Sequence, residues 1–170
     1  MSHVLYAVMC AAPPVHHVRE LITAAHQRDF DLCVVLTPTA ASWLADDLPE
    51  LEELTAHPVR STYKRPTDPD VLPKADAFLV APATFNTVNK WAAGISDTLA
   101  LGLINEAIGL RVPIVAVPYS QGALAEHPAY KPSLRTLEEA GVDILRIDSS
   151  VTARTFPWAA ALDRLLEHLP

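Results

Sequence analysis

Five short apolar segments recur along this chain of 170 residues, and they alternate with segments that have helical periodicity. The apolar segments are uniformly hydrophobic rather than alternating, which is typical of parallel strands covered by helices on both faces. A chain of this length is expected to form one domain. The pattern therefore predicts a single α/β domain over residues 1–170, a doubly wound parallel sheet whose strands are His3–Met9, Asp31–Leu36, Ala77–Ala81, Pro113–Val117 and Val142–Ile147.

Helices are expected between these strands and after the last one. Apolar residues of the first helical segment recur at three- and four-residue intervals after two prolines, which are tolerated in a first helical turn. Gly141 is placed to end the helix that precedes the last strand. The predicted helices are Pro14–Gln27, Thr37–Trp43, Pro49–Thr55, Thr87–Ile108 in two pieces divided near Gly94–Ser96, Pro132–Ala140 and Pro157–Leu169.

Composition excludes several classes of function. The chain has 15 prolines and only 5 glycines, and it contains neither of the two glycine-rich phosphate-binding loops, GxGxxG and GxxxxGK[ST]. A formal charge of −7 without a basic cluster argues against binding to nucleic acid. The two cysteines, Cys10 and Cys33, lie in apolar runs and do not form a disulfide framework, and the adjacent His16 and His17 point apart on a helix, so no metal site is expected. No apolar run is long enough to span a membrane and the first residues lack a signal-peptide pattern, so we expect a cytoplasmic protein.

Ligands of doubly wound sheets bind beyond the carboxyl ends of the strands. The most informative strand end is the run from Ala81 to Asp97, where Thr84, Asn86 and Thr87 stand directly before a helix. Two interpretations remain open for these three side chains. They cap the helix, or, together with free backbone N–H groups, they hold a phosphate at the positive end of the helix dipole.

The same run resembles the homo-oligomeric, flavin-containing Cys decarboxylases, a family that includes phosphopantothenoylcysteine decarboxylase and the peptidyl-cysteine decarboxylases of lantibiotic biosynthesis. The similarity extends over about Val4 to Ile147, and its specific part is a PASANT-type segment followed by a GIxDN-like turn. It implies a Rossmann-like flavoprotein that binds FMN at a subunit boundary and assembles as a trimer, or as a dodecamer built from trimers. The matching residues are Pro82, Ala83, Asn86, Thr87, Asn89, Lys90, Gly94, Ile95 and Asp97.

The resemblance also implies which residues contact the cofactor. They come from the end of the first strand, the end of the second strand, and the PASANT-type segment. Four large aromatic residues also lie near strand ends and either stack on the flavin ring or pack in the core, and of these we include Tyr119, after the fourth strand. The four are Trp43, Phe85, Trp91 and Tyr119. The cofactor-binding residues predicted in this way are Cys10, Ala11, Ala12, Thr37, Pro82, Ala83, Thr84, Asn86, Thr87 and Tyr119.

The sequence departs from the decarboxylase pattern at the residues that carry the reaction. Counting back from Ala75-Asp76, the place of the family's catalytic histidine falls at Asp68. The substrate-recognition segment, usually Pro-Ala-Met-Asn, reads Pro118-Tyr119-Ser120-Gln121. We therefore take Asp68, Ser120 and Gln121 as candidate catalytic residues.

Two functions are compatible with this sequence. One is an FMN-dependent, decarboxylase-like oxidoreductase that acts on a cysteine-type carboxylate, in a small molecule or at the C-terminus of a peptide. The other is a flavoprotein without catalytic activity, either a regulatory subunit or a flavin carrier.

Overall fold

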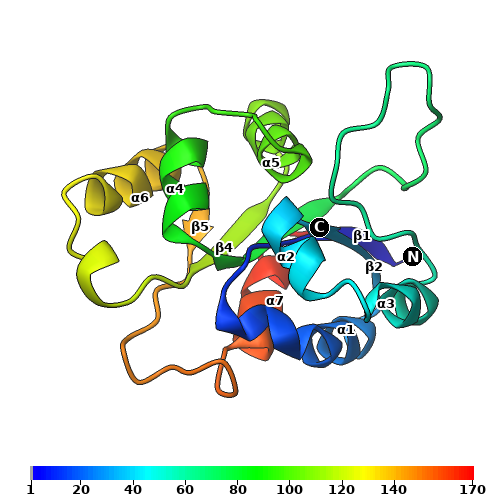
Figure 1. Cartoon of the computed structure of the whole chain (residues 1–170), viewed down its shortest axis with the longest axis horizontal. Helices are drawn as coiled ribbons and strands as arrows, with labels where there is room; N and C mark the ends of the chain where they lie inside the picture. Colours follow the sequence, from blue (N-terminus) through cyan, green and yellow to red (C-terminus); the bar gives the residue numbers. More distant parts are fainter. Residues whose placement is uncertain (1) are drawn as a thin grey trace.

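The computed structural model describes residues 2–170 and contains a five-stranded, wholly parallel sheet (Figure 1). The strand order is β2-β1-β3-β4-β5, so the chain reverses its direction of winding between β1 and β3. This order is that of flavodoxin-like folds, in which the ligand crevice lies between these two strands. The strands are β1 (His3–Met9), β2 (Phe30–Leu36), β3 (Ala77–Ala83), β4 (Ile114–Pro118) and β5 (Asp143–Ile144).

Helices cover both faces of the sheet (Figure 1). One face packs against the short 3-10 helix η1 and the helices α1, α2, α3 and α7, and the other packs against α4, α5 and α6. The bounds are η1 (Pro13–His17), α1 (Val18–His26), α2 (Pro38–Trp43), α3 (Leu48–Thr55), α4 (Phe85–Ala92), α5 (Leu99–Leu110), the 3-10 helix η2 (Gly122–Leu124), α6 (Tyr130–Glu139) and α7 (Trp158–Leu166).

The apolar strands form the centre of two hydrophobic layers. Successive residues of β1 alternate between them, so that Leu5 and Ala7 face one layer and Tyr6 and Val8 face the other. Every residue of β3 is buried. The strands are uniformly hydrophobic in the sequence because helices cover both faces of the sheet. The predicted single-domain, doubly wound α/β fold is confirmed.

Most predicted bounds shift by a few residues in the structure, and three elements change more noticeably. The predicted helix Pro14–Gln27 divides into η1 and α1 at His17–Val18. Strand β3 continues to Ala83, which pairs with Pro118 beyond a register shift. The predicted strand Val142–Ile147 is reduced to two paired residues, because the chain leaves the sheet after the Leu145 N–H donates to the carbonyl of Ala116.

The polar, proline-rich segment between α3 and β3 forms a long loop that projects from the domain (Figure 1). Arg60 holds its first part against the edge of the sheet, since its N–H donates to the carbonyl of Val34 and its carbonyl accepts from the N–H of Leu36. The Tyr6 hydroxyl donates to the carbonyl of Pro73 at 2.7 Å and holds the last part. Across residues 2–170, no helix is long and apolar enough to cross a membrane.

Candidate functional site

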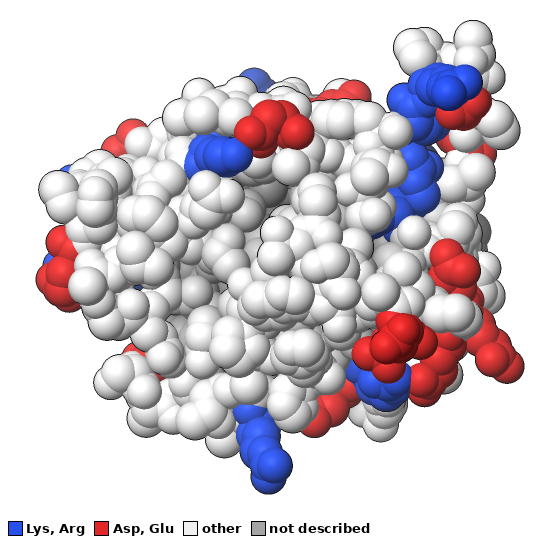
Figure 2. All heavy atoms as spheres, viewed as in Figure 1, with Lys and Arg blue, Asp and Glu red and all other residues white. Residues whose placement is uncertain are grey.

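A cavity of about 570 Å³ opens at the carboxyl ends of β1 and β3, where the strand order reverses. Its walls come from five places in the chain: the segment after β1, the starts of α2, α4 and α5, and the loop after β4. Figure 2 shows this face hollowed near its centre, with most charged side chains at its edge. A volume of this size is typical of a site for a small molecule or cofactor.

The start of α4 is fixed by hydroxyl groups. Thr84 is the N-cap, and its Oγ1 accepts from the N–H of Thr87 at 3.4 Å and donates to Thr87 Oγ1 at 3.2 Å. The buried thiol of Cys10 donates to the same Thr87 Oγ1 at 3.2 Å. The N–H groups of Phe85 and Asn86, in the first helical turn, have no partner within the helix and lie at the cavity wall.

Two further helices begin at the same cavity with a threonine N-cap. Thr37 Oγ1 accepts from the N–H of Ala40 at the start of α2, and Thr98 Oγ1 accepts from the N–H of Leu101 at the start of α5. The positive ends of three helix dipoles therefore meet at one cavity.

The side chains that line this cavity carry almost no charge. Within residues 2–170, its lining contains no aspartate, glutamate or histidine, and Lys90 is its one cation. Lys90 pairs with Asp97 at 2.6 Å on the rim. An anionic ligand would therefore meet hydroxyls, an amide and N–H donors without a carboxylate that repels it.

The loop after β4 forms the opposite wall. The N–H of Tyr119 donates to the carbonyl of Ala83, which ties this loop to the end of β3. Ser120 and Gln121 line the cavity beside Tyr119. Ser120 Oγ is buried without a hydrogen bond of ordinary geometry among the described residues. Its interaction with the Tyr130 hydroxyl partly offsets the rise that burial causes in the pKa of Tyr130.

Comparison with known proteins agrees with this architecture. The family model described as Flavoprotein matches residues 7–164. The chain belongs to the Flavoprotein family.

Two curated relatives and one solved structure show how far the similarity extends. The chain is 30% identical over 109 residues to a probable phosphopantothenoylcysteine decarboxylase of Streptococcus mutans, covering 61% of this chain and 60% of that protein. It is 36% identical over 72 residues to the coenzyme A biosynthesis bifunctional protein CoaBC of Thermococcus kodakarensis, covering 42% of this chain and 18% of that protein. The matched region thus spans at most about three fifths of these two relatives.

The solved structure is the cypemycin decarboxylase CypD, which shares the fold. Its TM-score is 0.73 and its identity 23%, with coverage of 98% of this chain and 95% of CypD.

The structure brings together most residues that the sequence predicts for the cofactor and the reaction. Three predicted cofactor residues, Cys10, Pro82 and Ala83, do not line the cavity and are buried beneath the residues that do. Cys10 is 1% exposed, the carbonyl of Pro82 accepts from the Cys10 N–H, and Ala83 is buried in the pairing with β4. Burial raises the pKa of the Cys10 thiol, which keeps it protonated. The predicted residues that line the cavity of this flavoprotein are Ala11, Ala12, Thr37, Thr84, Asn86, Thr87, Tyr119, Ser120 and Gln121.

Asp68 lies outside the cavity of its own chain. It is exposed in the projecting loop, where its carboxylate accepts from the N–H of Arg65 at 2.9 Å and its carbonyl accepts from Lys64 Nζ. The loop leaves the domain after Arg60, and this separates Asp68 from the carboxyl ends of the strands. A role for Asp68 as a base within one chain has no support in this geometry.

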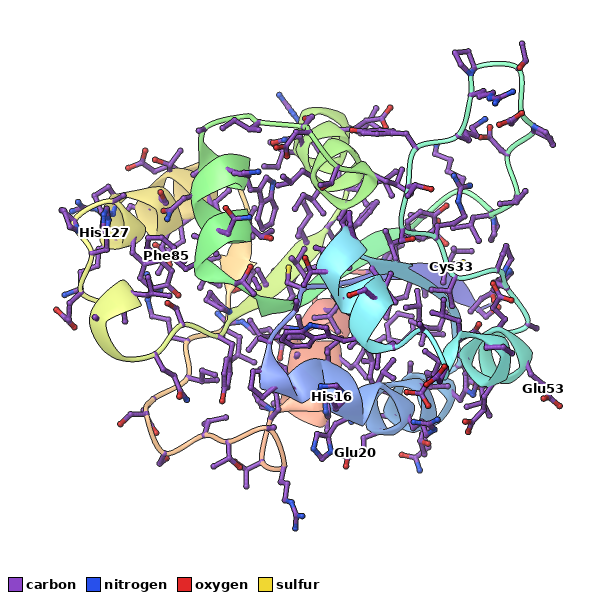
Figure 3. The ribbon with its side chains drawn as sticks, in the orientation of Figure 1. His16, Glu20, Cys33, Glu53, Phe85 and His127 are labelled. Carbon is purple, nitrogen blue, oxygen red and sulfur yellow. The ribbon has the colours of Figure 1, made fainter. Side chains whose placement is uncertain are left out.

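Several lining residues were not among the predicted site residues. Thr98 had a recognisable signal, because a threonine directly before an apolar run is typical of an N-cap. Phe85 stands inside the PASANT-type segment, and its ring lies 5.4 Å from that of His127 (Figure 3). His127 itself stabilises the chain before α6, since its Nδ1 accepts from the N–H of Ala129. The lining residues outside the predicted set of site residues are Pro13, Pro38, Thr39, Phe85, Lys90, Thr98, Leu101 and Leu124.

Proposed function

We propose that the cavity at the β1/β3 crevice binds FMN, and that the chain is a decarboxylase-like flavoenzyme acting on a cysteine-type carboxylate. The observation that carries this proposal is the convergence of three hydroxyl-capped helix starts on a cavity whose lining has no carboxylate. That arrangement suits a phosphate without a glycine-rich loop, in agreement with a chain that has only 5 glycines.

The residues present fit the two chemically different parts of FMN. The N–H groups at the start of α4, the Asn86 amide and the Thr37 hydroxyl supply donors for the phosphate. Tyr119 and Phe85 supply aromatic surface for the flavin ring. The probable phosphopantothenoylcysteine decarboxylase among the relatives supports the reaction class.

A bound flavin supplies the acceptor for the two electrons that leave the substrate when a cysteine-type thiol is oxidised before CO₂ is lost. The chain's own residues bind and orient the substrate. Ser120 Oγ and the Gln121 amide offer hydrogen bonds to the substrate carboxylate, which fixes its position. Leu124 and Tyr119 supply apolar surface at this end of the cavity.

A non-catalytic flavoprotein is the second candidate, and one observation favours it. The cavity of a single chain offers neither histidine nor carboxylate among its described lining residues to accept the thiol proton. In the catalytic version, Asp68 serves as that base only if the projecting loop of a neighbouring copy brings it to the cavity. The sequence position of Asp68, where the family has its histidine, is what supports that version.

We also propose that the chain assembles into a homotrimer, or into a dodecamer of trimers, and that it is located in the cytoplasm. Helix α5 supports self-association because its sequence, LALGLINEAIGL, is apolar around most of its circumference. Leu110 at its end is 64% exposed in the single chain, and Ile95 in the preceding turn is 42% exposed. A second copy packed against α5 would remove these side chains from water.

The first test is the visible absorption spectrum of the purified protein and of two variants. We expect flavin absorption bands in the wild type, and a loss of most bound FMN in Asn86→Ala. Gln27→Ala, which removes an exposed amide at the end of α1, is the matched control and is expected to retain FMN. A colourless wild-type protein that cannot be reconstituted with FMN would refute both candidate functions.

The second test separates the two candidates. FMN-loaded protein is incubated in air with cysteine-terminated peptides and with N-acyl cysteines. Mass spectrometry of the products is expected to show the loss of CO₂ and two hydrogens. If FMN-loaded protein leaves every substrate unchanged, the proposed decarboxylase activity is contradicted and the non-catalytic flavoprotein is favoured.

A further inference from the structure

The loop that projects from the domain makes a contact with the start of α5 that the proposed function does not use. Tyr63 lies in the first part of this loop, and its hydroxyl donates to the carbonyl of Ser96 at 2.9 Å. Ser96 stands 33 residues further along the chain, in the turn between α4 and α5. The contact therefore joins the projecting loop to the segment from which α5 begins (Figure 1).

Gly102 provides the space that Tyr63 occupies on α5. A Cβ added at Gly102 would lie 2.1 Å from Tyr63 Oη and 3.0 Å from Tyr63 Cζ, so no other residue fits there while the ring keeps its position. Glycine destabilises the interior of a helix relative to alanine. At this position it also permits the close approach of the ring to the helix backbone.

We propose that Tyr63 is a positioning residue of the flavin site, and that it holds the turn before α5, and with it the start of α5, in the geometry that binds the phosphate. The inference rests on the proposed function, because it takes the start of α5 as one of the three helix starts that hold the phosphate. Tyr63 does not line the cavity at the β1/β3 crevice and acts through Ser96 and Thr98.

The path from Tyr63 to the cavity is short. Thr98 follows Ser96 by two residues and is the N-cap of α5. Its Oγ1 accepts from the N–H of Leu101 at 3.2 Å, and its carbonyl accepts from the N–H of Gly102 at 2.9 Å. Thr98 and Leu101 both line the cavity. A displacement of the Ser96 carbonyl therefore reaches the lining through one intervening residue.

The turn is also held by the two helices that it joins. Asn105 Nδ2, on α5, donates to Ser96 Oγ at 2.9 Å, and Lys90 on α4 pairs with Asp97 at 2.6 Å. Tyr63 adds a contact from a different part of the chain, the loop before β3. Loss of the Tyr63 contact is thus expected to loosen the start of α5 while the turn itself persists.

Hydrogen exchange of the flavin-free protein, followed by mass spectrometry, tests whether Tyr63 holds the start of α5. In Gly102→Ala, the Cβ displaces the Tyr63 ring, whereas alanine by itself stabilises a helix, so the two effects have opposite signs. We expect exchange to become about fivefold faster in peptides that cover residues 96–102.

The matched control is Gly109→Ala in the same helix. A Cβ at Gly109 would meet no described atom within 4 Å, so this variant raises the helix propensity of α5 and leaves Tyr63 in place. We expect its exchange over residues 96–102 to equal that of the wild type or to be slower.

Titrations with FMN and with riboflavin separate positioning of the phosphate site from a general loosening of the cavity. Tyr63→Phe keeps the ring and loses the hydroxyl that bonds to Ser96, whereas Gly102→Ala displaces the ring as well. We expect the affinity for FMN to fall about fivefold in Tyr63→Phe and about tenfold in Gly102→Ala, and the affinity for riboflavin to change little. Gly109→Ala should retain both affinities.

The outcomes distinguish this inference from the proposed function. Exchange in Gly102→Ala that is no faster than in Gly109→Ala overturns the inference, and so does an unchanged affinity for FMN in Tyr63→Phe or in Gly102→Ala. An equal loss of affinity for FMN and riboflavin also overturns it. Each of these results leaves FMN binding by the wild type intact. Wild-type protein that takes up no FMN contradicts the proposed function, and the exchange comparison then reports by itself whether Tyr63 holds the start of α5.

Discussion

The two adjoining cavities at the carboxyl edge of the sheet are built in different ways. The cavity at the β1/β3 crevice owes its polarity to helix starts and capping hydroxyls, and its position to buried strands. The second cavity, of about 1050 Å³, lies between the loop after β4, the first turns of α6 and the segment after β5, and is called the α6 cavity here. It owes its polarity to long charged side chains at the exposed edge of the domain. The first design depends on backbone geometry, whereas the second depends on a few replaceable side chains.

This difference has a consequence for specificity. A cavity made by helix starts accepts the same anionic group in many sequences, because the N–H donors belong to the backbone. The α6 cavity changes its charge with a single substitution, because its polarity comes from charged side chains. These are Lys131, Arg135, Arg146, Glu126 and Asp148. We therefore expect a substitution in the lining of one cavity to leave ligand binding in the other unchanged.

The largest effect on ligand binding is expected from a carboxylate placed in the cavity at the β1/β3 crevice. Asp caps a helix at least as well as Thr, so Thr37→Asp should preserve α2 while it adds a negative charge to the lining. Repulsion of the FMN phosphate should cost about 3 kcal/mol, which weakens FMN binding roughly a hundredfold. Fluorescence titration with FMN measures the change.

The control for this variant is Thr37→Ser, which keeps a neutral capping hydroxyl and should bind FMN nearly as the wild type does. Thr37→Asp with wild-type affinity for FMN would show that the start of α2 is not part of the phosphate site.

Core residues beneath the two cavities are expected to differ in how much they contribute to the free energy of unfolding. Leu79 in the central strand β3 is 0% exposed, and Leu134 on α6 is 8% exposed. Leu79→Ala should lower the free energy of unfolding by about 3 to 4 kcal/mol and Leu134→Ala by about 2 kcal/mol, because the edge can relax around the smaller side chain. Urea denaturation measures the free energy of unfolding of both variants. An equal loss for the two variants would contradict the expectation that the sheet edge relaxes more readily than the central strand.

The smallest effect concerns acid stability next to the α6 cavity. Asp143 in β5 accepts from Arg164 Nε at 2.7 Å and from His168 Nε2 at 2.8 Å. Burial by itself raises the pKa of Asp143, but these two partners together outweigh it and hold the pKa below its usual value. A lowered pKa stabilises the fold above the unfolded-state pKa of about 3.9, and this contribution is lost as the pH falls through the folded-state pKa.

We therefore expect Asp143→Asn to be less stable than the wild type at pH 7, by less than either leucine variant, and the gap to close as the pH falls below about 4. Denaturation at several pH values measures the gap. Asp163→Asn, at an exposed carboxylate paired with Arg28, is expected to show a smaller gap throughout. A gap for Asp143→Asn that stays constant below pH 4 would contradict the role of the ion pairs.

The sequence predicted the sheet well, and most of the candidate site residues line one cavity, for a physical reason. Buried parallel strands leave an uninterrupted apolar signal, and capping residues such as Thr84 stand directly beside that signal in the chain. Prediction was poorer at the sheet edge, where β5 is short because the chain turns away after Leu145.

The α6 cavity was missed because its cations are distant in the sequence. Arg146 meets Lys131 and Arg135 only after the chain has passed through β5. The four-residue spacing of Lys131 and Arg135 on a predicted helix was the one local signal. The candidate base Asp68 stays a prediction, since alignment with a family position does not reveal that its loop projects away from the cavity of its own chain.

A comparison of FMN with riboflavin shows whether the helix starts hold a phosphate without a glycine-rich loop. The two ligands share the ring and differ in the phosphate, and fluorescence titration of the flavin-free protein gives both dissociation constants. We expect FMN to bind at least about a hundredfold more tightly than riboflavin, because its phosphate accepts several charge-assisted hydrogen bonds. Equal affinities for FMN and riboflavin would contradict it.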